Sequence, residues 1–236
     1  MLGYVTNRVH SLAATIAMKN IQRGLGSAVS GLSDQKYEKS LAYFRFWFGI
    51  GQTYSQVPPD LIFDVICDCR ATGHSRGSDF IYPNAHQVLR FVSDVESDTI
   101  LGLHSAGLRS RFCTRILRDF FDTNLETMHN GCNAPERFYM DANLIAHGIN
   151  LGYIEEDAIR NHILQSLLSH HELYGHQAIA LAILFKMAGA TFEAYVDPAV
   201  VDRFFELLKN HREFLRNHRV ELTRASAFST QGFWNH

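Results

Sequence analysis

Two stretches in the C-terminal half decide the fold: DANLIAHGINLGYIEEDAIRNHILQSLLSH, from Asp141 to His170, and HQAIALAILFKMAGATFEAYVDPAVVDRFFELLKNH, from His176 to His211. In both, apolar residues recur at the spacing of an amphipathic helix, first in one helix and then in a second. Aligning Gly152 with Gly189 gives a period of 37 residues (189 − 152), and the second helices align at an offset of 40 (Leu167 with Leu207). We interpret the two stretches as one helix pair that occurs twice.

Earlier parts of the chain carry weaker versions of the same unit. SDTILGLHSAG ends at Gly107 and is followed by LRSRFCTRILRDFF, and SLAYFRFWFGIG ends at Gly51 and is followed by PPDLIFDVICDCR. Neither helix of such a pair can bury its apolar stripe alone, so neighbouring pairs must stack into one core. Because no run shows the alternation of a strand, the sequence predicts an all-α fold, an α-solenoid of about four to five stacked antiparallel helix pairs with a repeat near 37 residues.

Glycine and proline mark the expected helix ends. Gly107, Gly152 and Gly189 each follow a first helix, where glycine readily takes the left-handed conformation that closes a helix. Asp197 followed by Pro198 predicts a helix start, with the aspartate as N-cap. The run GLGSAVSG, residues 24–31, lacks the lysine of a P-loop and follows no strand, so we interpret it as a flexible connector.

The composition is that of a globular protein. Of 236 residues, 46% are hydrophobic and 19% are charged, and the formal net charge is -2. This charge excludes a strongly basic, indiscriminate nucleic-acid binder, so any RNA contact must come from a local patch. Apolar stretches such as residues 178–185 are shorter than the roughly 20 residues that cross a bilayer, so no membrane span is expected.

The first 33 residues permit two interpretations. They contain Arg8, Lys19 and Arg23 and no acidic residue before Asp34, which is typical of a mitochondrial transit peptide. The alternative is an ordinary first helix that faces the core with its apolar residues, which are Val5, Val9, Leu12, Ile16 and Met18. We expect a mitochondrial location, and otherwise a cytoplasmic one. Residues 34–223 then form the helical-repeat domain, and residues 224–236 an irregular C-terminal tail.

The pattern ANLIAHGINLGY, followed by a second helix that ends in LQSLL, carries a family resemblance. It resembles the helical repeats of the octotricopeptide, heptatricopeptide and FAST-kinase-like proteins, over about residues 97–211. Those proteins act in organelle RNA metabolism, so the resemblance implies a role there. The C-terminal RAP domain that many of them carry is not evident, and this argues against nuclease activity.

One motif suggests metal chemistry. HELYGH, residues 171–176, resembles the HExxGH zinc motif of the dipeptidyl peptidase III family, in which two imidazoles bind the metal and the glutamate activates a water. A third ligand is missing, since only Glu193 and Asp197 lie nearby in sequence. We therefore expect no metal site, and we expect His147 to be a core imidazole within a helix contact.

Two arginine-rich rows are the candidate binding residues. Guanidinium groups at helical spacing suit contacts with the phosphates of RNA. The forked N–H groups of each guanidinium can donate to a phosphate oxygen, while its positive charge displaces a counterion. The alternative is a solvated face on which acidic neighbours such as Asp119 pair with the arginines. The first row consists of Arg109, Arg111, Arg115 and Arg118, and the second of Lys209, Arg212, Arg216 and Arg219.

The sequence therefore favours a non-catalytic helical-repeat subunit of a mitochondrial RNA-associated assembly, such as the mitochondrial ribosome or an RNA-processing complex. Its expected partners are protein subunits of a larger complex and RNA, with no cofactor and no small-molecule substrate. Two alternatives stay open. One is a protein-only scaffold subunit of another organellar complex, which the near-neutral charge favours, and the other is a zinc hydrolase of the HExxGH type.

Overall fold

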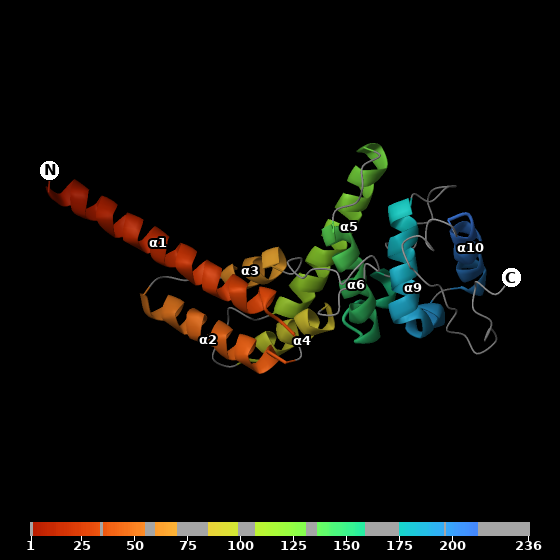
Figure 1. Ribbon diagram of the computed structural model, residues 1–236, viewed down its shortest axis with the longest axis horizontal. Coiled ribbons are helices and arrows are strands. Elements are labelled where there is room, and N and C mark those ends of the chain that lie inside the picture. The colour runs from red at the N-terminus through yellow and green to blue at the C-terminus, as the bar shows by residue number, and fades with distance from the viewer. Residues whose placement is uncertain are drawn as a thin grey trace. The chain divides into compact units, whose positions relative to one another are not determined.

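A computed structural model of the chain describes residues 2–33, 35–54, 60–69, 85–98, 107–130, 136–158, 175–195 and 197–211. All regular secondary structure in these ranges is helical, which confirms the all-α class (Figure 1). The helices are α1 (Leu2–Ser30), α2 (Tyr37–Tyr54), α3 (Leu61–Cys69), α4 (Ala85–Glu96), α5 (Leu108–Asn130), α6 (Glu136–Asn150), α7 (Glu156–Ala158), α9 (Gly175–Tyr195) and α10 (Pro198–Lys209). None of these described helices is both long and apolar enough to cross a membrane.

The chain divides into two compact units. Unit 1 comprises Met1–Gly73 and Gln87–Phe112, and unit 2 comprises His74–His86 and Cys113–His236. The boundary falls within α4 and within α5, so each of these helices supplies residues to both units. Each unit has its own set of buried apolar side chains.

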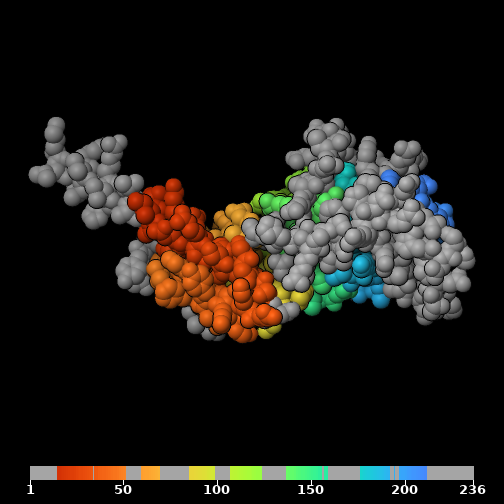
Figure 2. Space-filling view, in the orientation of Figure 1, coloured from red at the N-terminus to blue at the C-terminus, as the bar shows by residue number. Residues whose placement is uncertain are grey.

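Unit 1 is built on an antiparallel hairpin of α1 and α2. The two helices lie side by side, as the red and orange atoms in Figure 2 show, and α1 also packs against α3. Phe44 of α2 meets Phe91 of α4 edge to face at 5.1 Å, and both rings are fully buried. Polar contacts tie the same two helices together, because the Tyr37 hydroxyl donates a hydrogen bond to Asp94 at 2.6 Å. Burial, and then this hydrogen bond, raise the pKa of Tyr37.

The glycine run of residues 24–31 is part of α1 as far as Ser30, so its interpretation as a flexible connector is wrong. Its glycines serve close packing instead. A Cβ at position 24 would lie 2.3 Å from Cδ2 of Trp47, and a Cβ at position 26 would lie 2.9 Å from Sγ of Cys69. Only residues without a side chain allow α2 and α3 to approach α1 so closely.

One residue of the apolar face expected for α1 is not buried. Ile16 is 52% exposed, so this residue does not face the core as the first-helix interpretation required. Val5, Val9 and Leu12 lie among the side chains that the structure does not describe. Among the described side chains of α1, the buried apolar ones include Ile21, Leu25, Ala28 and Val29. The second half of α1 is therefore a structural part of unit 1.

Unit 2 is centred on α9, in which every residue from Ala178 to Phe185 is buried. A helix that is apolar all round requires neighbours on several sides. On one side lies α10, where Phe204 packs against Phe185 with ring centroids 5.6 Å apart. On another side lies α6 (Figure 1).

Helices α6 and α9 run in the same direction. Near their beginnings, the rings of Phe138 and His176 lie 5.6 Å apart. Near their ends, Asn150 Nδ2 donates to the carbonyl of Met187 at 2.6 Å, and Thr191 Oγ1 donates to Asn150 Oδ1 at 3.0 Å. The sequence offsets of these contacts are 38 (176 − 138), 37 and 41, close to the period of 37 read from the sequence.

The predicted helix ends are partly confirmed. Gly152 has a φ of 67°, and Tyr153 and Gly152 donate their N–H groups to the carbonyls of Gly148 and Ile149, which closes α6 as a Schellman motif. Asp197 caps α10 through a 2.8 Å bond from Ala199 N, and Pro198 is the first helical residue. Gly107 is also left-handed, with a φ of 65°, but it directly precedes α5, and the expected helix before it lies outside the described residues.

The expectation for Gly189 is wrong. This glycine lies within α9, which continues to Tyr195, and it does not adopt a positive φ. Gly189 is buried in the interior of the helix, where its backbone is helical like that of its neighbours. Gly152 and Gly189 are therefore not equivalent helix ends, although they lie on neighbouring parallel helices.

We expect Gly24→Ala to lower the free energy of unfolding of unit 1 by about 1–3 kcal/mol, because the new methyl group collides with the rigid Trp47 ring. Gly49→Ala in α2 is the matched control, since a Cβ there meets nothing within 4 Å. The control should be neutral or stabilising by up to about 1 kcal/mol. Urea unfolding followed by circular dichroism measures both, and equal midpoints for the two variants would disprove the close-packing role.

Candidate functional site

The first two arginines of the predicted row on α5 are each matched by one carboxylate of unit 1. Arg109 Nε lies 3.4 Å from Glu96 Oε2, and Arg111 Nη2 lies 2.9 Å from Asp60 Oδ1. Arg111 also stacks over the Phe63 ring, 4.5 Å from its centroid. Each of these two arginines therefore has a partner of opposite charge.

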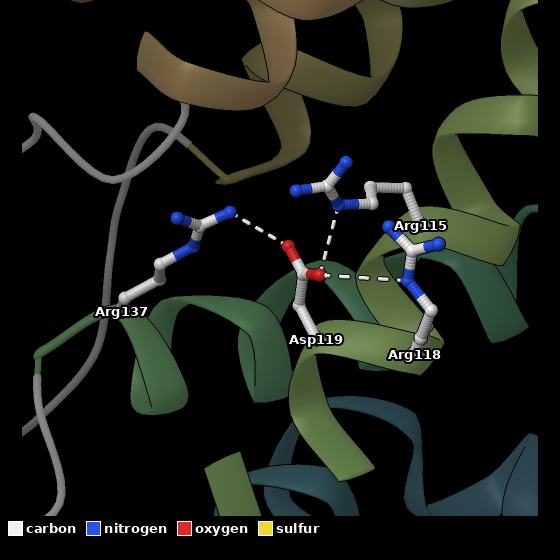
Figure 3. Close-up of polar contacts among 4 residues, drawn as sticks. All are labelled: Arg115, Arg118, Asp119 and Arg137. Carbon is white, nitrogen blue, oxygen red and sulfur yellow. Dashed lines mark hydrogen bonds and ion pairs between the residues drawn. The ribbon is translucent and has the colours of Figure 1, made fainter. Parts of the chain in front are cut away.

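The last two arginines of the row belong to a different arrangement in unit 2, which we call the Asp119 cluster: Arg115, Arg118, Asp119 and Arg137 (Figure 3). Arg115 Nε donates to Asp119 Oδ1 at 2.8 Å, and Arg137 Nη2 donates to Oδ2 at 2.6 Å. Arg118 Nε is 3.9 Å from Oδ1, which is an ion pair without a hydrogen bond. Three guanidinium groups thus share a single carboxylate.

The cluster is brought together by the aromatic contact between α5 and α6. The rings of Phe120 and Phe138 stack almost parallel, 4.6 Å apart, and both are fully buried. Asp119 directly precedes the first ring and Arg137 the second, so the stack holds this acid and this base next to each other. Phe112 is also buried, which leaves the arginines of α5 on the outer faces of the helix.

The carboxylate of the cluster is less accessible than its cations. The side chain of Asp119 is 15% exposed, whereas those of Arg115, Arg137 and Arg118 are 33%, 39% and 60% exposed. Among the described residues, no second carboxylate pairs with these three arginines, so their formal charge with Asp119 is +2 (3 − 1). Asp122, one turn beyond Arg118, is exposed and lowers the local charge to +1.

Arg137 belongs to the site although the sequence analysis did not include it. It lies 18 residues from Asp119, on a different helix, and no local spacing links the two. The sequence indicates this contact only indirectly. Arg137 directly precedes the apolar residues of α6, and Asp119 directly precedes a phenylalanine pair on α5. The contact between Asp119 and Arg137 can be predicted only when α5 and α6 are known to pack together.

The second basic row is described only at its first residue. Lys209 is exposed at the end of α10 and pairs with Glu206, one turn earlier in the same helix. Arg212, Arg216 and Arg219 lie outside the described residues. On the described part, therefore, this row consists of one lysine that already has an acidic partner.

The histidines singled out from the sequence occupy helix contacts. His176 is buried in the first turn of α9 against Phe138, and burial lowers its pKa. The His147 ring lies 5.8 Å from that of His86, and burial followed by the charge of His86 lowers the pKa of His147. Residues 171–174 of HELYGH are outside the described ranges, and within those ranges no three potential ligands gather around a common point.

Comparison of the chain with protein-family models, with curated proteins and with solved structures gives no match. The chemistry of the site must therefore be argued from its own residues. Its distinguishing property is a surplus of guanidinium groups around one partly buried carboxylate.

We expect Asp119→Asn to destabilise unit 2 by about 1–2 kcal/mol, because it weakens two charge-assisted hydrogen bonds and leaves three cations without a counter-charge. Asp122→Asn removes the same charge from the same helix at an exposed position and should change stability by less than about 0.5 kcal/mol. Thermal unfolding of both variants tests this. A Tm for Asp119→Asn equal to that of the control would mean that the cluster does not hold α5 and α6 together.

Proposed function

We propose that this protein is a non-catalytic helical-repeat subunit of a mitochondrial RNA-associated assembly, such as the mitochondrial ribosome or an RNA-processing complex. The observation that carries the proposal is the unequal pairing of the arginines on α5. Arg109 and Arg111 each have one acidic partner, whereas Arg115, Arg118 and Arg137 share one. In a chain whose net charge is -2, such a local surplus is the feature that attracts a polyanion.

The packing of α6 against α9 supports the repeat architecture within this proposal. In a solenoid, the first helices of successive units lie side by side in the same direction, and equivalent residues are one repeat apart. The contact of Asn150 with Met187 spans 37 residues, which is the expected repeat. The returning second helix of the first unit would fall in residues 159–174, outside the described ranges.

The mitochondrial location rests on the basic, acid-free residues 1–33. Because Ile21, Leu25 and Val29 of this segment are buried in unit 1, we propose that it directs import and then remains in the protein. A fluorescent protein fused behind residues 1–33 should enter mitochondria, since the segment is cationic and helical. A diffuse cytosolic signal, with a fusion carrying Arg8→Glu and Lys19→Glu as comparison, would contradict the location.

A protein-only scaffold is the second candidate, and exposed aromatic side chains on α2 favour it. Tyr43 and Phe46 are both exposed and meet the Trp47 ring edge to face, with centroids 6.1 and 6.0 Å apart. Aromatic residues are enriched where proteins bind one another. A subunit of an RNA-containing complex needs protein contacts as well, so the two functions are compatible.

We expect the full-length protein, purified with its partners from the organelle, to carry RNA whose removal by RNase releases a part of those partners. Phosphate contacts account for the RNA, so the association should weaken as salt rises. The measurement is mass spectrometry and RNA sequencing of the complex with and without RNase. A complex with the same protein subunits after RNase, and no RNA above the level of a mock purification, would leave the scaffold as the function.

A further inference from the structure

We propose that the Asp119 cluster is the site at which this protein holds neighbouring phosphate groups of an RNA backbone. This inference rests on the proposed RNA-associated function and narrows it, because it selects two of the four arginines of α5 and adds Arg137 of α6. Arg109 and Arg111 are left out, since Glu96 and Asp60 already neutralise them.

In the Asp119 cluster the carboxylate is the more buried group and the guanidinium groups are the more exposed ones. Asp119 is the least exposed of the four side chains, and the three more exposed arginines place their guanidinium groups around its carboxylate (Figure 3). An anion that approaches from solvent therefore meets the guanidinium groups before it meets the carboxylate. Asp119 repels a phosphate, but it also fixes Arg115 and Arg137 in place, which reduces the entropy lost when they bind a ligand.

Unused hydrogen-bond donors point to a ligand with several acceptor oxygens. Arg115 uses only its Nε toward Asp119, which leaves both of its Nη groups. Arg137 uses Nη2 toward Asp119, which leaves Nη1 for a ligand, because its Nε is buried and cannot be reached from solvent. Arg118 makes no hydrogen bond to Asp119 at 3.9 Å, so its whole fork remains for a ligand.

A phosphodiester fits these donors better than the carboxylate of a partner protein does. A carboxylate offers two oxygens at a single point, whereas an RNA backbone offers two non-bridging oxygens at each of several successive phosphates. Three adjoining forks suit a polyanion, because binding it releases several condensed counterions and each release adds to the affinity. Phosphate contacts of this kind position a backbone without reading its sequence, so we expect no base preference from this site.

The test compares two double variants of the full-length chain by fluorescence anisotropy with a labelled single-stranded RNA over a range of salt concentrations. Arg115→Gln with Arg118→Gln removes two charges from the cluster. Arg109→Gln with Arg111→Gln removes two charges from the same helix, at arginines that already have acidic partners. The cluster variant should bind roughly tenfold more weakly at moderate salt, and the slope of log K against log salt should flatten by about 1.4, or 0.7 per lost phosphate contact. The control should keep the affinity and the slope of the wild type.

Two further variants separate a binding role from a structural one. Arg118→Gln alone removes an exposed side chain that forms no hydrogen bond with Asp119, so it should fold as the wild type does and still flatten the slope by about 0.7. Arg137→Lys keeps the charge and loses the fork, so it should weaken binding severalfold without changing the slope. Circular dichroism and urea unfolding of each variant verify that the helices remain intact.

The outcomes distinguish a failure of the phosphate-site inference from a failure of the proposed RNA-associated function. Equal losses in the cluster variant and its control, or no loss in Arg118→Gln, would overturn the cluster as the phosphate site while RNA binding itself stands. Absence of RNA binding by the wild-type protein would overturn the proposed function, and the inference with it. If RNA binding is unchanged but the cluster variant loses a protein from the RNase-treated complex, the cluster binds a carboxylate of that protein and the inference is wrong.

Discussion

Burial of α9 is the constraint on which unit 2 depends. A helical segment with eight consecutive buried residues, Ala178 to Phe185, exposes no face to water, so other helices must surround this part of α9. Helix α6 covers one side and α10 another. The aromatic contacts follow from this arrangement, since Phe138 of α6 reaches both His176 of α9 and Phe120 of α5.

The charged surface is a consequence of the same packing. Once Phe112, Ile116 and Phe120 of α5 face inward, the arginines between them must lie toward the outside. The Phe120–Phe138 stack then places Asp119 beside Arg137, and a carboxylate that already serves Arg115 is shared again. Positive charge thus accumulates locally in a chain whose total charge is slightly negative.

Features that depend on neighbours in sequence could be predicted, and those that depend on neighbours in space could not. Helical periodicity gave the all-α class, and local turn chemistry identified Asp197 as a cap and Gly152 as a helix end. Glycine has a second use, as a place of close approach, and Gly24 can be recognised as such only when Trp47 is known to lie against it. The same limit applies to the arginines, because the partner of Arg111 is 51 residues away.

The two hydrogen bonds of Asn150 give the α6–α9 pair a mechanical property. One amide group donates to the carbonyl of Met187 and accepts from the hydroxyl of Thr191, and these two positions are one helical turn apart on α9. A small slide of α9 along α6 breaks both bonds at once and offers no intermediate position with equivalent partners. The two bonds therefore fix the register of α9 along α6, so that residues about one repeat apart in the sequence stay side by side.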